Sequence, residues 1–228
     1  MEEKNKNKLL AEYFARFISE HKINFVEKVL NQRTRHITMV LEDIYQSQNA
    51  SAVIRTCECM GIQDVHIIEN DSKYTVNRRV LKGSYKWVDL IRHKGKSRNN
   101  TELCFEALRA RGYRIAVTDP SPEGISIHEL TVDDKIAIVM GNELRGTSSY
   151  AIENADLKVN IPMYGFTESL NISVSAAICL NALVPALRNS EIKWQLTEAE
   201  KDEIKLSWLR KMVRNAEIIE KEFLKSIA

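Results

Sequence analysis

The chain has 228 residues, of which 44% are hydrophobic and 28% charged, and its formal net charge is +2. This composition allows a sizeable core and excludes a membrane-embedded protein, because no run approaches the ~18 consecutive apolar residues of a transmembrane helix. The charged start, residues 1–6, lacks the apolar core of a signal peptide, so we expect a cytoplasmic protein.

The first predicted element is helical. Residues 8–30 carry apolar side chains at helix-like intervals, with Lys and Arg between them. We therefore expect a helical extension over residues 1–33. Such an extension is more often a packing or dimerisation element than a site of chemistry.

From residue 34 to 190, short β-rich runs alternate with amphipathic helices. This alternation predicts an α/β domain with a mostly parallel sheet that is covered by helices on both faces. The expected strands are 36–43, 64–69, 87–92, 113–119, 135–141 and 157–162, and the expected helices are 49–60, 100–111, 147–154 and 169–189.

The first segment with functional potential is the start of the helix at 49–60. Asn49 is a favourable N-cap residue, and Arg55 follows about one and a half turns further along the helix. Taken alone, a helix cap and a solvated or salt-bridged arginine explain both residues.

A basic segment follows between residues 73 and 98. It contains nine Lys or Arg residues and one acid, Asp89, which gives a charge of +8. Tyr74, Tyr85 and Trp87 interleave with these cations, as on a surface that contacts phosphates and stacks on bases. The alternative is a solvated basic loop with the aromatic residues in the core, where we expect Trp87. The candidate phosphate contacts are Arg33, Arg78, Arg79 and Lys82.

The loop after the strand at 135–141 contains two glycines. Gly141 and Gly146 allow the backbone to approach a flat or anionic ligand closely. The spacing is that of a phosphate loop, but Thr147 stands where the lysine belongs, and the middle glycine of a dinucleotide fingerprint is missing. An NTPase and a nicotinamide oxidoreductase are therefore disfavoured, and a plain strand–loop–helix junction stays open.

The strand at 157–162 ends at Pro162, which cannot donate to a sheet ladder. A glycine and several small polar residues then precede a long apolar helix. Backbone groups left free at the carboxyl end of a strand are used by α/β proteins to hold nucleotide-like ligands. We expect the binding site here.

At the carboxyl end, Thr197 and Glu200 form a predicted capping box. An apolar stripe from Trp208 to Phe223 then predicts one helix within residues 191–228.

The spacing of the cysteines and histidines indicates neither a set of disulfide bonds nor a metal site. Cys57 and Cys59 lie two residues apart on one predicted helix, Cys104 and Cys179 are isolated, and the five histidines are scattered. We expect reduced structural cysteines and no metal site.

Three segments, in this order, resemble the motifs of the SpoU branch of the SPOUT RNA 2′-O-methyltransferases. N-x-x-A-x-x-R is matched by Asn49, Ala52 and Arg55, G-x-E-x-x-G by Gly141, Glu143 and Gly146, and I-P-M-x-G-x-x-x-S-L-N-x-S-V by residues 161–174 without a gap. The resemblance covers roughly residues 36–189. The helical ends point to the TrmH-like tRNA guanosine 2′-O-methyltransferases within this family, since about 35 residues are too few for a separate amino-terminal RNA-binding domain.

The resemblance implies S-adenosylmethionine as methyl donor without a metal, RNA as substrate, a homodimer, and a carboxyl-terminal trefoil knot that no periodicity in the sequence indicates. Arg55 is implied at the reactive hydroxyl. Implied contacts of the donor's adenosine are Thr118, Gly141, Ile161, Met163 and Leu170. The residues implied for catalysis beside Arg55, where they support the loops or the substrate, are Asn49, Glu143, Ser169 and Asn171.

The role of Arg55 and the target both stay open. Deprotonating an arginine at pH 7 costs on the order of 8 kcal/mol, so we favour a group that anchors a phosphate and stabilises the developing alkoxide over a literal base. A guanosine in the tRNA D-loop is the leading target. Ribosomal RNA, another tRNA position, and a non-catalytic RNA-binding protein of the same fold are the alternatives.

Overall fold

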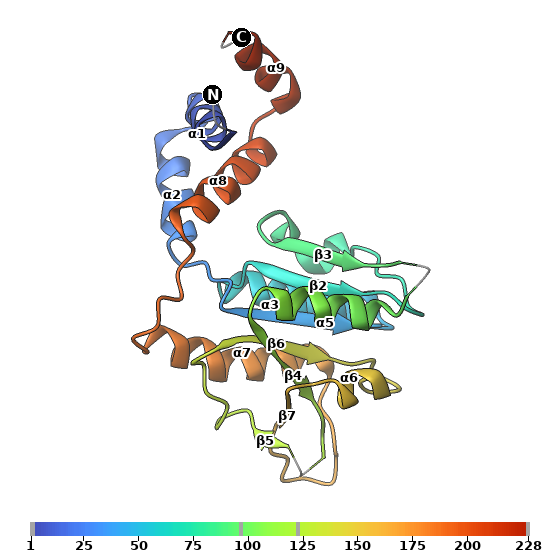
Figure 1. Cartoon of the computed structure of the whole chain (residues 1–228). Coiled ribbons are helices and arrows are strands. Elements are labelled where there is room, and N and C mark those ends of the chain that lie inside the picture. The colour runs from blue at the N-terminus through green and yellow to red at the C-terminus, as the bar shows by residue number, and fades with distance from the viewer. Residues whose placement is uncertain (1–2, 96–97, 122–123, 227–228) are drawn as a thin grey trace. The chain divides into compact units, whose positions relative to one another are not determined.

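We describe the protein from a computed structural model, which describes residues 3–95, 98–121 and 124–226. The chain divides into two compact units (Figure 1). One is an α/β unit from Thr34 to Trp194. The other is a helical unit made by the residues before Thr34 together with those after Trp194.

The α/β unit is built on a seven-stranded sheet in which every neighbouring pair is parallel. The strand order is β3-β2-β1-β6-β4-β7-β5. The strands are β1 (Ile37–Glu42), β2 (Asp64–Ile68), β3 (Asp89–His93), β4 (Tyr113–Thr118), β5 (Ile125–Ser126), β6 (Lys135–Met140) and β7 (Leu157–Asn160). The mostly parallel sheet expected from the sequence is confirmed.

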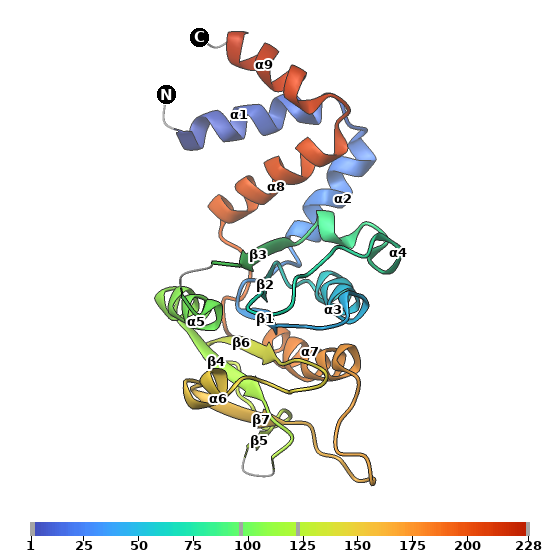
Figure 2. The same cartoon turned by 90° about the vertical axis from the view of Figure 1, so that its right-hand side faces the viewer.

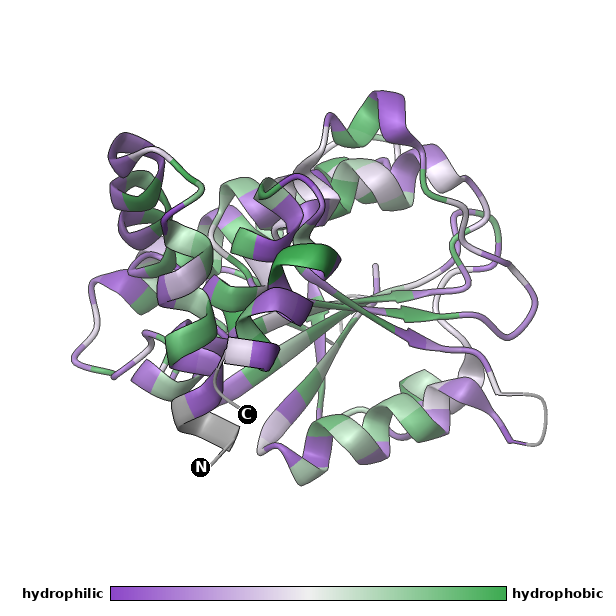
Figure 3. Ribbon diagram, turned by 90° about the horizontal axis from the view of Figure 1, so that it is seen from above, coloured by the Kyte–Doolittle hydropathy of each residue, from purple (hydrophilic) through white to green (hydrophobic). Residues whose placement is uncertain are grey.

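Helices cover both faces of this sheet. Helices α3 (Ser47–Cys59) and α7 (Ile172–Arg188) lie on one face, and α5 (Asn100–Ala110) and α6 (Ser149–Glu153) lie on the other (Figure 2). The strands between them are coloured as largely hydrophobic (Figure 3).

The central strands are mostly apolar because both of their sides are buried. On β1, Met39 and Leu41 point into the core under α3 and α7, whereas Val40 points into the core under α5. Strand β6 alternates in the same way, with Ile138 on the first face and Val139 on the second. These two strands form the centre of the unit, so their carboxyl ends provide a rigid base for the loops that follow.

Three short elements were not expected from the sequence: α4 (Arg78–Leu81), the 3-10 helix η1 (Ser84–Lys86) and β5. Two predicted helices begin later than expected. Ser148 caps α6 by accepting a hydrogen bond from the amide of Ala151, and Asn171 caps α7 by accepting one from the amide of Ser173.

The helical unit contains α1 (Glu3–Ala15), α2 (Glu20–Leu30), α8 (Glu198–Met212) and α9 (Ala216–Ser226). Leu10, Phe14, Leu209 and Phe223 lie in its core. The predicted capping box of Thr197 and Glu200 is present at the start of α8.

The prediction of a single carboxyl-terminal helix is wrong, because the chain forms two helices there, α8 and α9. Val213 leaves the helical conformation with a ψ of 132°. Asn215 has a φ of 57°, in the left-handed region that asparagine tolerates better than most residues. The apolar stripe therefore continues across a break between two helices.

All four cysteines are free thiols, and all except Cys59 are buried. Among the described residues no helix is long and apolar enough to cross a membrane.

Candidate functional site

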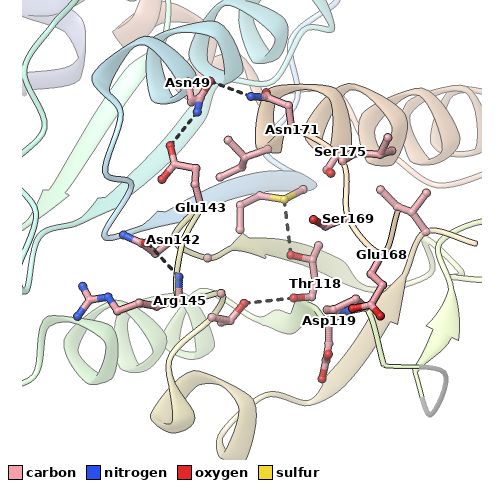
Figure 4. Close-up of a pocket in the computed structure, with 18 of the residues that line it drawn as sticks. Asn49, Thr118, Asp119, Asn142, Glu143, Arg145, Glu168, Ser169, Asn171 and Ser175 are labelled. Atoms are coloured by element: carbon pink, nitrogen blue, oxygen red, sulfur yellow. Dashed lines mark hydrogen bonds between the residues drawn. The ribbon is translucent and has the colours of Figure 1, made fainter. Parts of the chain in front are cut away.

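A cavity of about 710 Å³ lies at the carboxyl ends of β4, β6 and β7 (Figure 4). Its walls come from the loops that follow these strands, residues 118–120, 140–147 and 159–171, and from the first turns of α3 and α7. Its volume is in the range of small-molecule sites, and its position at the ends of parallel strands is where α/β proteins bind ligands.

The loop after β6 is closed on itself. The backbones of Asn142 and Gly146 exchange two hydrogen bonds, of 2.9 and 2.8 Å. A Cβ on Gly141 would lie 2.2 Å from the backbone nitrogen of Thr147, so no other residue fits there, and Gly146 has a φ of +70°. Both glycines are thus required by the shape of the loop, which turns its backbone toward the cavity.

The loop after β4 is tied to its neighbours by Thr118. The Thr118 hydroxyl donates to the carbonyl of Val139 at 2.9 Å, and the Thr147 hydroxyl donates to the carbonyl of Thr118 at 3.2 Å. The structure brings all five predicted adenosine contacts into the lining of this one cavity: Thr118, Gly141, Ile161, Met163 and Leu170.

The prediction that Asn49 caps its helix is wrong, because α3 begins two residues earlier, with Gln46 at its N-cap. Instead, the side-chain amide of Asn49 donates to a carboxylate oxygen of Glu143 at 2.8 Å. The same carboxylate accepts the backbone amides of Tyr45 at 2.8 Å and Gln46 at 3.2 Å. Glu143 therefore fastens the loop after β6 to the start of α3.

Asn171 extends this chain of contacts to the third motif. Its side-chain amide donates to Asn49 Oδ1 at 3.2 Å, while its own oxygen caps α7. A continuous path of side chains, Glu143–Asn49–Asn171, thus joins the three segments that the sequence analysis selected (Figure 4). Ser169 lines the cavity beside this path.

Glu143→Ala is expected to lower the free energy of unfolding by about 1–2 kcal/mol, because three donors lose a charged acceptor at a partly solvated site. Glu143→Gln keeps one acceptor oxygen and should lose less. Urea unfolding measures both effects. The control is Glu153→Ala, which removes an exposed carboxylate at the end of α6. If Glu143→Ala is as stable as Glu153→Ala, Glu143 does not fasten the loop after β6 to the start of α3.

The charged residues that line the cavity are three acids, Asp119, Glu143 and Glu168, and one base, Arg145. Arg145 is partly neutralised by an ion pair with Asp71 at 2.9 Å. The cavity therefore favours a ligand with positive charge. The sequence analysis missed Asp119, Arg145 and Glu168. Asp119 follows the last residue of β4, so the convergence of parallel strand ends is a signal that could have identified it.

Arg55 does not line the cavity. It is exposed on α3, where its guanidinium lies 3.5 Å from the carbonyl of Val80 in α4. Within one chain, the structure brings Arg55 to the basic segment and not to the predicted donor contacts.

The basic segment is only partly as expected. Arg78, Arg79 and Lys82 are exposed and form no salt bridge with a described residue. Arg92, in contrast, pairs with Glu69 at 2.6 Å, and this ion pair raises the pKa of the guanidinium. Lys96 lies outside the described residues.

The aromatic residues of this segment are not a stacking surface. Tyr74 is buried, where burial raises the pKa of its phenol, and Tyr85 packs against the main core. Trp87, which we expected in the core, is half-buried. These positions favour the alternative that the aromatic residues anchor a basic loop.

The prediction that Arg33 contacts a phosphate is wrong. Its side chain is 1% exposed, and its guanidinium lies over the ring of Trp208 at 5.2 Å from the centroid. A residue at the end of a charged, helical extension looks solvated in the sequence, but here it is a packing residue of the helical unit.

Comparisons with known proteins agree on one family. The model of the SpoU rRNA Methylase family matches residues 36–181. A tRNA (guanosine(18)-2′-O)-methyltransferase of Borreliella burgdorferi is 46% identical over 206 residues, which are 90% of this chain and 92% of the relative. The protein of that name from Aquifex aeolicus is 31% identical over 72% of this chain and 75% of the relative.

A crystal structure is similar over the same region. The structure described as an A. aeolicus TrmH/SpoU tRNA modifying enzyme superimposes with a TM-score of 0.76 at 28% identity. The match covers 86% of this chain and 98% of that one.

Proposed function

This protein belongs to the SpoU rRNA methylase family, whose model matches more than half of the chain, and we propose that it methylates the 2′-hydroxyl of the guanosine at position 18, in the D-loop of tRNA. The observation that carries this proposal is that residues of all three family motifs line one cavity. The relatives named for this reaction support tRNA over ribosomal RNA. Because tRNA is the proposed substrate, we also propose that the protein acts in the cytoplasm.

The cavity fits S-adenosylmethionine as the methyl donor. The donor supplies a methyl group on a positively charged sulfur that is its own leaving group. The three carboxylates of the cavity favour that charge, and its 710 Å³ is large enough for a nucleoside with an amino-acid chain. The five predicted contacts, from Thr118 to Leu170, would hold the adenosine, largely through backbone groups of closed loops.

The protein's own task is then alignment. The Glu143–Asn49–Asn171 path fixes the two loops and two helix starts around the cavity, which sets the donor's position relative to an incoming ribose. Arg55 would hold a phosphate of the target nucleotide and stabilise the oxygen as it loses its proton. A permanently charged arginine suits this role better than that of a base.

Mass-spectrometric mapping of ribose methylation tests the proposal. The purified protein is incubated with unmodified tRNA, with ribosomal RNA and with a labelled donor. Label at guanosine 18 of tRNA is expected. Label only in ribosomal RNA, or at another tRNA nucleotide, would overturn the target, and no label in any RNA would favour a non-catalytic RNA-binding protein.

Donor binding is expected to be independent of metal. Calorimetry in the presence of EDTA should show S-adenosylmethionine and its demethylated product binding at one site per chain. The reason is that the backbone groups and carboxylates of the cavity can contact the positively charged donor directly, without a metal ion between them. Binding that disappears under chelation would contradict this expectation.

The proposal includes a homodimer. The loops after β6 and β7 carry exposed apolar side chains: Leu144 is 78% exposed, Tyr164 98% exposed, and Phe166 fully exposed. Monomeric proteins rarely leave such a group uncovered. Arg55 and the basic segment, moreover, do not line the cavity of their own chain. An isologous dimer that sets the basic segment of one subunit near the cavity of the other would account for both observations.

Light scattering at micromolar concentration should give twice the 26.2 kDa of one chain. Mixing variants tests the shared site. Arg55→Ala and Ser169→Arg, which puts a cation into the cavity, should each be inactive alone. Refolded together, they should recover about a quarter of the wild-type activity, because half of the dimers then carry one intact site. A 26 kDa species, or no recovery, would contradict the shared site.

The proposal also includes the trefoil knot implied by the resemblance. The chain leaves β7, two strands away from β6, and enters α7, which packs against α3. Residues 161–171 therefore pass the carboxyl ends of β4 and β6, and the knot would form if this segment threads through a loop there. Ordinary α/β connections do not thread loops.

A further inference from the structure

A cluster of three potential metal ligands lies beneath α5, outside the cavity. His66 is on β2, His93 is the last residue of the edge strand β3, and Cys104 is on α5. His66 Nδ1 is 3.0 Å from His93 Nε2 and 3.8 Å from Cys104 Sγ. One ligand atom from each residue lies within 4.8 Å of the others.

The two separations from His66 Nδ1 are close to those of ligands around one tetrahedral ion. Zinc binds imidazole nitrogen at ~2.0–2.1 Å and thiolate sulfur at ~2.3 Å, so two nitrogens are about 3.3 Å apart, and nitrogen and sulfur about 3.6 Å. The observed 3.0 and 3.8 Å differ from these values by only a few tenths of an ångström. We propose that His66, His93 and Cys104 bind Zn²⁺.

The surroundings suit a structural ion. His66 and Cys104 are buried, and His93 is half-buried. Burial lowers the pKa of His66 to about 4 and also lowers that of His93, so both imidazoles are neutral at pH 7 and have a lone pair to offer. Among the described residues His66 Nε2 has no hydrogen-bond partner, so no bond at that nitrogen fixes the tautomer.

The donor set selects the metal. One thiolate with two imidazoles favours zinc or Cu(I) over magnesium and calcium, which prefer oxygen. Burial and the nearby Glu42 carboxylate raise the pKa of the Cys104 thiol, so zinc must displace its proton on binding. Because the chain supplies three ligands, water would complete the fourth position.

The ion would cross-link β2, β3 and α5. Strand β3 is an edge strand that pairs only with β2, so this link would give it a second attachment. None of the three ligands lines the cavity, so zinc would not take part in methyl transfer. The histidines appear scattered in the sequence because the ligands come from two paired strands and a helix.

Metal titration of the full chain tests this site. Protein stripped with a chelator and then freed of it is titrated with Co²⁺ as a spectroscopic probe, and with Zn²⁺ against a chromophoric chelator. One ion per chain and a near-ultraviolet thiolate-to-cobalt band are expected. Cys104→Ser should abolish the band and weaken zinc binding at least ~100-fold, because loss of even an outer-shell partner costs 10–100-fold.

Two controls separate this site from other thiols. Cys179→Ser removes an equally buried thiol on α7, and Cys59→Ser removes the exposed one on α3. Both variants should keep the band. His93→Gln changes a half-buried side chain and should lose the rise in melting temperature that zinc gives to wild type, even where Cys104→Ser fails to fold. Wild type without stoichiometric binding, a band that survives Cys104→Ser, or a zinc-dependent rise in melting temperature that survives His93→Gln would overturn the site.

Discussion

Replacing Arg55 by alanine is expected to reduce methylation of tRNA at least ~100-fold and to leave the affinity for S-adenosylmethionine almost unchanged. The two effects separate because Arg55 does not line the donor cavity but is proposed to stabilise the reacting oxygen. Its exposed guanidinium, whose one hydrogen-bond partner among the described residues is the carbonyl of Val80, is accessible to a phosphate. Single-turnover methylation and calorimetry measure the two quantities.

Arg55→Lys should also be poor, because a compact ammonium does not reproduce the planar guanidinium fork. The matched control is Arg114→Ala. Arg114 is an exposed arginine at the amino end of β4, opposite the cavity, and pairs there with Asp134 at 3.4 Å. Near-normal turnover by Arg55→Ala, or a loss equal to that of Arg114→Ala, would exclude the assigned role.

The regular part of the α/β unit was predictable because its signal repeats along the chain. Buried strands such as β1 and β6 read as apolar runs, and helices such as α5 have an apolar face that recurs every three to four residues. The elements that were missed, α4, η1 and β5, have two to four residues each and contain no complete period. Helix breaks such as the one before α9 depend on a single φ angle.

Within the site, the sequence could identify the loops but not their pairings. Asn49 looked like a local cap because a polar residue at a helix start usually is one, but its partners lie 94 and 122 positions away in the sequence. Whether a side chain is buried also depends on residues that are distant in the sequence. Arg33 and Tyr74 carry groups that favour solvent, and only the folded chain shows what covers them.

Neutralising the three exposed cations around α4 is expected to weaken tRNA binding and flatten its salt dependence. The variant carries Arg78→Gln, Arg79→Gln and Lys82→Asn. Asparagine is chosen because Lys82 has a φ of 46°, in the left-handed region that asparagine tolerates. Each lost phosphate contact should reduce the slope of log K against log salt by up to ~0.7–0.9, because it no longer releases a counterion.

Filter binding of tRNA across a salt series measures this slope, and donor affinity should not change. The matched control is Arg98→Gln with Arg109→Gln and Arg114→Gln, which removes the same charge from exposed arginines that are already ion-paired with Glu102 or Glu106, Asp156 and Asp134. If both variants flatten the slope equally, total charge and not a defined surface attracts the RNA. If neither does, phosphate contacts belong elsewhere, and the lysines and arginines of the helical unit become the surface to test. Only a selective effect at α4 supports a phosphate-binding surface that includes the neighbouring Arg55, because α4 and Arg55 are already in contact through Val80.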